Sequence, residues 1–172
     1  MFKKPIIVFE GIEGSGKSHH IAKVSRYLDN KRIGYIKIRE PGGSTNSEKI
    51  RKLILNQKSN FTVKTDLLLY LAARSENINQ IKKFYKKKVI LIDRFIDSTI
   101  AYQHYGMGID LKIIKYVNKF LLKDIKVDYT FLNIVNKKNL SLRLKKRKTL
   151  NRYDKFKMSF YNKVQKGFIK IS

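Results

Sequence analysis

A glycine-rich segment near the N-terminus has the residue types and spacing to hold a polyphosphate. Residues 11–18 read GIEGSGKS and follow directly on an apolar run at 6–9. Glycines at this spacing let backbone N–H groups and the N-terminus of a following helix point at negative charge. Lys17 can then reach the β- and γ-phosphates, and the Ser18 hydroxyl can bind Mg²⁺. The segment predicts a nucleoside triphosphate site, rather than a turn without a ligand, made of Gly11, Ile12, Glu13, Gly14, Ser15, Gly16, Lys17 and Ser18.

Two further segments place charged residues at the ends of apolar runs. REPGGS at 39–44 lets Arg39 offer a two-pronged donor to a phosphate, although Pro-Gly-Gly is also typical of an ordinary turn. Asp93 and Arg94 close the run at 89–93. There Asp93 can hold Mg²⁺ through water and Arg94 can neutralise a transferring phosphoryl group; the alternative is a structural ion pair. All three residues are expected at the carboxyl ends of strands, where open parallel sheets form their ligand crevice.

Short apolar runs that alternate with longer helical patterns define the elements that must position these residues. Strands are predicted at 6–10, 35–40, 89–93 and 129–134, and helices at 66–86 and 111–122. This alternation predicts an α/β fold with a parallel sheet and helices on both faces. No repeat or linker divides the chain, so residues 1–172 are expected to form a single domain.

Composition narrows the possible partners and the compartment. The net charge of +26 would suit nucleic acid, but the lysines are scattered over almost every segment, which favours solvated lysine faces over a dedicated nucleic-acid patch. Cysteine is absent, which excludes disulfides and thiolate metal sites and fits a reducing cytoplasm. No run of about 18 apolar residues and no apolar leader is present, so neither a membrane span nor export is expected.

Five ordered motifs resemble the thymidylate kinase family over about residues 5–168. They are FEGIEGSGKS at 9–18, REPGGS at 39–44, LLLYLAARSENI at 67–78, DRFIDSTIAYQ at 93–103 and RLKKRKTLNRYD at 143–154. The resemblance implies a P-loop nucleoside monophosphate kinase fold that transfers the γ-phosphoryl group of ATP to dTMP, giving dTDP and ADP in dTTP biosynthesis. It also implies Mg²⁺ as cofactor and a homodimer.

The resemblance assigns acceptor-site roles residue by residue. Glu13 matches the acidic residue that meets the deoxyribose 3′-hydroxyl, although Glu stands here rather than Asp. Tyr70 matches the aromatic residue that stacks on thymine, and Arg74, one helical turn later, matches the arginine that hydrogen-bonds the base. Tyr102 matches the ring that fills the space of a ribose 2′-hydroxyl. The implied acceptor-binding set is Glu13, Arg39, Tyr70, Arg74, Arg94, Ser98, Thr99, Tyr102 and Gln103.

The basic segment 143–154 resembles the family's lid, which closes over ATP and keeps water from the transferred phosphate. The phosphate loop lacks the arginine that one branch of the family carries there. The bacterial-type branch places it in the lid, so Arg147 and Arg152 join Lys17 and Arg94 as catalytic candidates, with Arg143 a weaker one. His19 and His20 are adjacent on one helix and point about 100° apart, which argues against a two-histidine metal site.

The end of the sequence departs from the family pattern. Family members continue into one further strand and a final helix, whereas this sequence ends at Ser172, so the final edge strand and helix are expected to be missing. Two other functions remain open at this stage. One is a deoxynucleoside kinase of the same fold, which would need a catalytic carboxylate but no Arg39, and the other is a basic nucleic-acid-binding protein with a degenerate phosphate loop.

Overall fold

The computed structural model describes residues 4–146 and 151–172 of the chain. Four parallel strands form one sheet in the order β2 (Tyr35–Arg39), β3 (Val89–Asp93), β1 (Ile6–Glu10), β4 (Tyr129–Leu132). In the register Phe9 lies opposite Asp93, and Arg39 lies opposite Asp93 on the other side. The carboxyl ends of β1, β2 and β3 therefore end side by side, so the three chemistry-bearing segments start from one edge.

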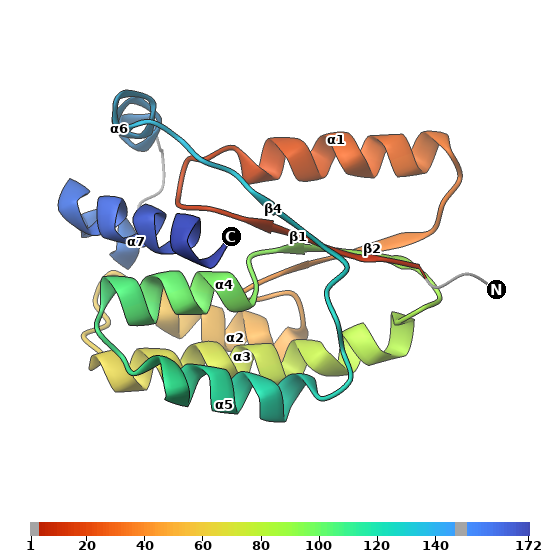
Figure 1. Cartoon of the computed structure of the whole chain (residues 1–172), viewed down its shortest axis with the longest axis horizontal. Helices are drawn as coiled ribbons and strands as arrows, with labels where there is room; N and C mark the ends of the chain where they lie inside the picture. The colour runs from red at the N-terminus through yellow and green to blue at the C-terminus, as the bar shows by residue number, and fades with distance from the viewer. Residues whose placement is uncertain (1–3, 147–150) are drawn as a thin grey trace.

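Helices cover both faces of this sheet (Figure 1). Helix α1 (Lys17–Asn30) lies on one face. On the other lie α2 (Thr45–Leu55), α3 (Val63–Phe84), α4 (Ile96–Thr99), which continues as the π-helix η1 (Ile100–Gly106), and α5 (Leu111–Leu122). Helices α6 (Lys137–Lys145) and α7 (Met158–Ile171) lie beyond the carboxyl ends of the strands, and a short 3₁₀ turn, η2 (Arg152–Lys155), precedes α7.

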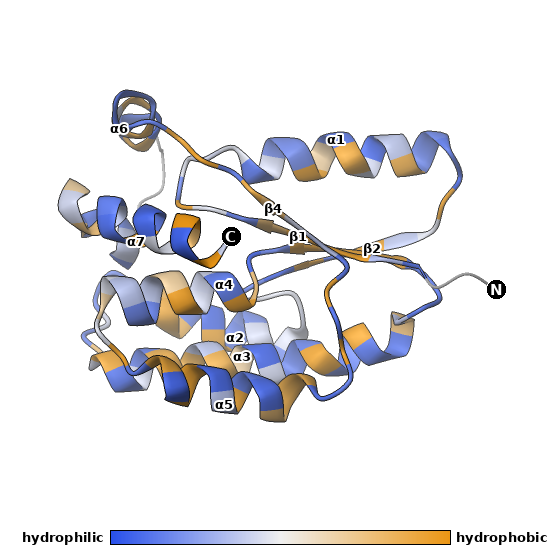
Figure 2. Ribbon diagram, in the orientation of Figure 1, coloured by the Kyte–Doolittle hydropathy of each residue, from blue (hydrophilic) through white to orange (hydrophobic). Residues whose placement is uncertain are grey.

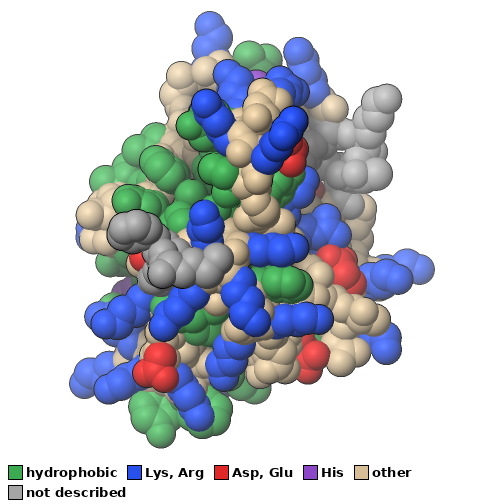
Figure 3. Space-filling model, turned by 90° about the vertical axis from the view of Figure 1, so that its right-hand side faces the viewer, with side chains coloured by type: hydrophobic (Ala, Val, Ile, Leu, Met, Phe, Trp, Pro, Cys, Tyr) green, Lys and Arg blue, Asp and Glu red, His purple; other side chains and the backbone are tan. Residues whose placement is uncertain are grey.

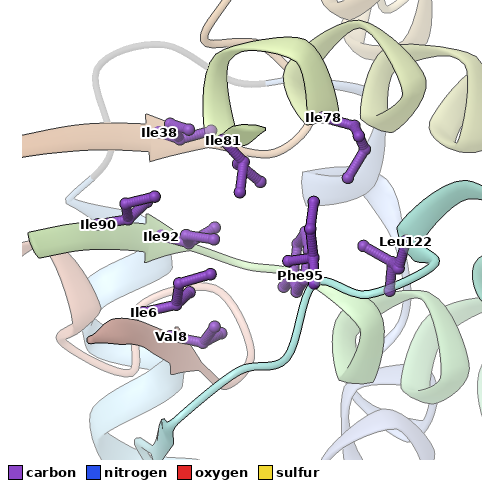
Figure 4. Packing of buried hydrophobic residues seen from close by; sticks show 10 residues of the cluster. Ile6, Val8, Ile38, Ile78, Ile81, Ile90, Ile92, Phe95 and Leu122 are labelled. Atoms are coloured by element: carbon purple, nitrogen blue, oxygen red, sulfur yellow. The ribbon is translucent and has the colours of Figure 1, made fainter. Parts of the chain in front are cut away.

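Alternation along the strands builds two core layers. Ile6 and Val8 face α3 and α5, where they pack with residues such as Ile81 and Phe95 (Figure 4). Ile7 and Phe9, the alternate residues on β1, pack instead with the buried face of α1. Because successive strand side chains point to opposite faces, the apolar runs of β1 and β3 fill both layers and must lie inside the sheet.

A third apolar cluster holds α7 against η1, beside the carboxyl end of the sheet. Tyr102, Tyr161, Val164 and Phe168 are among its buried members. The two helices approach closely because Gly167 has no side chain: a Cβ there would lie 2.7 Å from the ring of Tyr105. This packing holds η1, the source of several expected acceptor-site residues, against α7.

The predicted α/β architecture is confirmed, with small shifts at the ends of elements. The strand predicted at 129–134 ends at Leu132, and the helix predicted at 66–86 runs from Val63, after its Thr62 N-cap, to Phe84. Lysine and arginine side chains are spread over the side of the molecule from which the N-terminus emerges (Figure 3). Within residues 4–146 and 151–172, no helix has the length and apolar character needed to cross a bilayer.

Candidate functional site

The phosphate loop connects β1 to α1 and opens into a cavity of about 800 Å³. Gly16, just before α1, has φ 100°, and Gly11 has φ 133° with only 2.3 Å between an added Cβ and the Asn133 carbonyl oxygen. Both positions therefore require glycine. The buried Lys17 ammonium donates to the Gly11 and Ile12 carbonyl oxygens at 2.9 Å each. Burial lowers the pKa of Lys17 to about 7.

Arg94, directly after β3, binds the phosphate loop inside the cavity. Its Nη2 donates to Glu13 Oε1 at 2.9 Å, and its Nη1 donates to the Gly11 carbonyl oxygen at 2.8 Å. The Tyr102 hydroxyl donates to the other Glu13 carboxylate oxygen. Burial alone would raise the pKa of Glu13, but Arg94 and Tyr102 hold it below its usual value. The structure thus brings together three residues that the sequence assigned to the acceptor site.

Glu10, at the end of β1, stabilises the backbone that follows Arg94. Its carboxylate accepts from the backbone N–H groups of Phe95 and Ser98 and from the Ser98 hydroxyl at 2.5 Å. Burial raises its pKa to about 7. Arg94 itself has φ 67°, so its backbone lies in a region that ordinary residues rarely adopt. The hydrogen bonds to Glu10 hold Phe95 and Ser98, which follow Arg94 in the sequence.

Arg74, on α3, is 2% exposed and lines the cavity. Its Nε donates to Glu40 Oε2 at 2.8 Å, its Nη2 donates to the Thr99 hydroxyl at 3.0 Å, and its Nη1 donates to Asn118 Oδ1 at 2.6 Å. Burial raises the pKa of Glu40, and Arg74 partly offsets that increase. Arg74 is therefore held by residues from three other segments.

Aromatic side chains form a wall beside Arg74. Tyr70 and Tyr102 both line the cavity, and each packs edge-on against Tyr153, with ring centroids 6.2 and 6.1 Å apart. Gln103, from η1, is buried and lines the same cavity, and its Nε2 has no hydrogen-bond partner among the described residues. An unpaired buried amide donor facing a cavity suits a ligand with a hydrogen-bond acceptor.

Ser18 and Asp93 fit a divalent cation with oxygen ligands. The Ser18 side chain is exposed at the start of α1, Asp93 ends β3, and both line the cavity. Asp93 Oδ1 is buried and has no hydrogen-bond partner among the described residues. A buried carboxylate oxygen without a partner is unfavourable unless a cation or water satisfies it. Oxygen donors of this kind are those that Mg²⁺ prefers.

Arg39 is placed at the cavity, but it is not free. It is 55% exposed and pairs with Glu48 on α2, with Nη2 to Oε1 at 3.0 Å. Arg51, also on α2, lies beside it on the cavity wall and donates to the Pro41 carbonyl oxygen at 2.6 Å. To bind a phosphate, the Arg39 guanidinium must break its ion pair with Glu48 or divide its N–H donors between Glu48 and the phosphate.

The arginines of the predicted lid have different surroundings. Arg143 donates to the Gly14 carbonyl oxygen at 2.6 Å and lines the cavity. Arg152 instead pairs with Asp66 at the start of α3, at 2.5 Å, and does not line the cavity. Arg147 lies outside the described residues. Arg143, the weaker candidate from the sequence, is thus the one described lid arginine that contacts the phosphate loop.

Sequence reasoning missed several residues that shape the site: Glu10, Glu40, Arg51, Asn118 and Tyr153. Glu10 and Glu40 stand inside quoted motifs, and an acidic residue at the end of an apolar strand was an available signal. The sequence also held a signal for Asn118, because this residue lies between Ile114 and Leu122 on the buried stripe of α5. A polar residue on a helix's apolar stripe needs a buried partner.

Comparison with known proteins shows what the chain is similar to. The thymidylate kinase family model matches residues 9–172. A thymidylate kinase from Carboxydothermus hydrogenoformans is 37% identical, with 96% of this chain and 83% of the relative covered. One from Clostridium novyi is 38% identical, with 99% and 86% covered. The crystal structure of thymidylate kinase from Ehrlichia chaffeensis matches with a TM-score of 0.79 and 34% identity, covering 98% of this chain and 86% of that one. This likeness confirms the predicted P-loop kinase fold.

Proposed function

The chain belongs to the thymidylate kinase family, which phosphorylates dTMP with ATP in nucleotide biosynthesis, and we propose that this transfer takes place in the cavity at the carboxyl end of the sheet. One observation carries the proposal. The phosphate loop, the Asp93–Arg94 turn and the Tyr70–Arg74 face of α3 all line this single cavity. A donor phosphate and an acceptor nucleotide can therefore meet in one cavity.

The donor side is the phosphate loop, residues 11–18. Its backbone N–H groups and the start of α1 would hold the ATP phosphates, and Lys17 would exchange its loop carbonyls for phosphate oxygens. The family uses ATP with a divalent metal, and we infer Mg²⁺ because Ser18 and Asp93 offer oxygen ligands. When bound, Mg²⁺ neutralises charge on the β- and γ-phosphates.

The acceptor side binds dTMP by base, sugar and phosphate. Tyr70 would stack on thymine, while Arg74, Thr99 and Gln103 would meet its polar edge, a role supported by the unpaired Gln103 amide. Glu13 would accept from the 3′-hydroxyl, and Tyr102, which is fixed to Glu13, would occupy the place of a 2′-hydroxyl. The Arg39, Arg94 and Ser98 side chains would hold the 5′-phosphate.

The chemistry needs positioning and charge neutralisation more than a base. An oxygen of the dTMP phosphate attacks the γ-phosphorus of ATP, the bond from that phosphorus to the β–γ bridging oxygen breaks, and ADP leaves with the electron pair. The attacking oxygen is already anionic, so no proton must be removed from it. Lys17, Arg94 and a lid arginine, from Arg147, Arg152 and Arg143, take up the charge that develops on the transferred group.

We also propose that the chain works as a homodimer in the cytoplasm. Exposed apolar side chains on α3 and α5 support a partner there; they are Leu68, Ile113, Tyr116 and Phe120. Tyr116 is 76% and Phe120 67% exposed, and both lie on α5, four residues apart on one side of the helix. Hydrophobic and hydrophilic residues alternate along both helices (Figure 2). The absence of cysteine fits a reducing compartment.

An ADP-release assay with dTMP as acceptor tests the site. Wild-type chain should release ADP with dTMP and not with thymidine, whose neutral hydroxyl lacks the anionic oxygen that this site is arranged to accept. Lys17→Met should remove turnover and leave the fold intact, with a single cooperative thermal unfolding transition. Lys23→Met, on the exposed side of α1, is the matched control and should keep full activity. Full turnover in Lys17→Met would refute the proposed donor site.

A further inference from the structure

Asn118 connects α5 to the acceptor side of the cavity without lining it. It is 4% exposed and comes 44 residues after Arg74 in the sequence, yet its Oδ1 accepts from Arg74 Nη1 at 2.6 Å. It is the residue through which α5, otherwise an outer helix, reaches the functional arginine. None of the sequence motifs that point to function includes it.

The two ends of the Asn118 amide are each committed to one partner. Nδ2 donates to the Ile114 carbonyl oxygen, one turn earlier on α5, at 2.8 Å, and Oδ1 accepts from Arg74. A guanidinium has donors and no acceptor, so a flipped amide would set N–H groups against each other. The bond to Ile114 therefore holds the oxygen toward Arg74.

The donors of Arg74 are nearly all used by the protein. A guanidinium has five N–H groups in a fixed plane. Nε donates to Glu40, Nη2 donates to Thr99 and lies 2.6 Å from Glu40 Oε2, and one N–H of Nη1 goes to Asn118. Among the described residues, the second N–H of Nη1 has no acceptor. Asn118 thus binds the same nitrogen that has a donor left for a ligand.

We propose that Asn118 is a positioning residue for nucleobase recognition: it holds the Arg74 guanidinium so that the second N–H of Nη1 faces the base of dTMP. The inference rests on the proposed role of Arg74 in binding that base. The guanidinium also lies over the Phe95 ring, with 5.0 Å from its central carbon to the ring centroid, so its plane is supported. Glu40 and Asn118 bind opposite edges of the guanidinium, so together they prevent it from rotating within its plane.

Three variants separate positioning from simple stability. Asn118→Leu removes the acceptor at similar volume, Asn118→Asp keeps it, and Leu122→Ala weakens the buried side of the same helix without contacting Arg74. Residues in direct contact show coupling that corresponds to changes of roughly 2- to 150-fold. We expect Asn118→Leu to raise the KM for dTMP by about tenfold and to leave the KM for ATP unchanged. Asn118→Asp should restore most of the dTMP KM, and Leu122→Ala should lower the Tm without changing either KM.

A double-mutant cycle with Arg74→Lys tests the path through Arg74. Lys keeps a positive charge beside Glu40 but lacks the planar fork, so the fold is retained while the proposed geometry is lost. Once Arg74 is replaced, Asn118→Leu should add less than about a twofold further loss in dTMP KM. Equal losses in both backgrounds, an equal rise in both KM values, or no rescue by Asp would overturn the inference. An unchanged dTMP KM in Arg74→Lys alone would instead refute the proposed role of Arg74.

Discussion

Replacing Arg74 should destabilise the fold as well as weaken dTMP binding, because the side chain neutralises a buried acid. Glu40 is 5% exposed, and Arg74 is the one cation that contacts its carboxylate among the described residues. In Arg74→Met the Glu40 carboxylate would stay buried without an opposite charge. We therefore expect a loss in the free energy of unfolding that a surface arginine would not give.

The expected loss in the free energy of unfolding follows from the interactions that the partners of Arg74 lose. Removing one member of a buried ion pair costs about 3–5 kcal/mol, a large part of a typical total of about 5–15 kcal/mol. Adding Glu40→Leu removes the stranded charge and should restore more than half of that loss. Recovery should be incomplete, because Asn118 Oδ1 and the Thr99 hydroxyl also lose their bonds to Arg74, at about 1 kcal/mol each.

The pH dependence of the Arg74→Met deficit gives a second, independent check. Burial already raises the pKa of Glu40, and the loss of Arg74 should raise it further. A carboxyl group with a raised folded-state pKa favours the folded state below its unfolded-state pKa, and that contribution disappears as the pH rises through the folded-state value. The deficit should therefore be smaller at pH 5 than at pH 8.

Urea denaturation at matched protein concentration measures the stabilities, and calorimetry with dTMP measures binding. The double variant should be stable but still bind dTMP weakly, which separates the two roles of Arg74. A loss below about 1 kcal/mol in Arg74→Met, or no recovery on adding Glu40→Leu, would refute the reasoning.

Three further predictions concern neighbouring parts of the site. Glu10, whose pKa burial raises from 4.5 to about 7, should contribute stability below pH 4.5 that is lost as the pH rises through 7. In urea titrations across that range, wild type should therefore lose roughly 3 kcal/mol relative to Glu10→Gln, and parallel profiles would contradict this. Gly167→Ala should lower stability by about 1–3 kcal/mol through the clash with Tyr105, whereas Gly34→Ala, with its nearest neighbour at 3.8 Å, serves as the control. Tyr102→Ala should narrow the ratio of kcat/KM between dTMP and ribothymidylate, and an unchanged ratio would remove Tyr102 from sugar selection.

The sequence by itself determined the features that depend on local spacing. The phosphate loop could be recognised because its glycines, Lys17 and Ser18 act within one turn, and the strands because short runs rich in apolar residues stand between turn signals. Parallel strands joined by helices have their carboxyl ends at one edge, so the grouping of Arg39, Asp93 and Arg94 also followed from the order of elements.

Only the tertiary structure decided which partner each arginine of the site contacts. Arg74 meets Glu40, Thr99 and Asn118 across 34, 25 and 44 residues of sequence, and Arg152 pairs with Asp66 across 86. No local pattern encodes such contacts, because they arise from the packing of whole helices against one sheet. The same packing sets which groups are buried, and burial is what moves the pKa of Glu10 and makes the charge of Glu40 depend on Arg74.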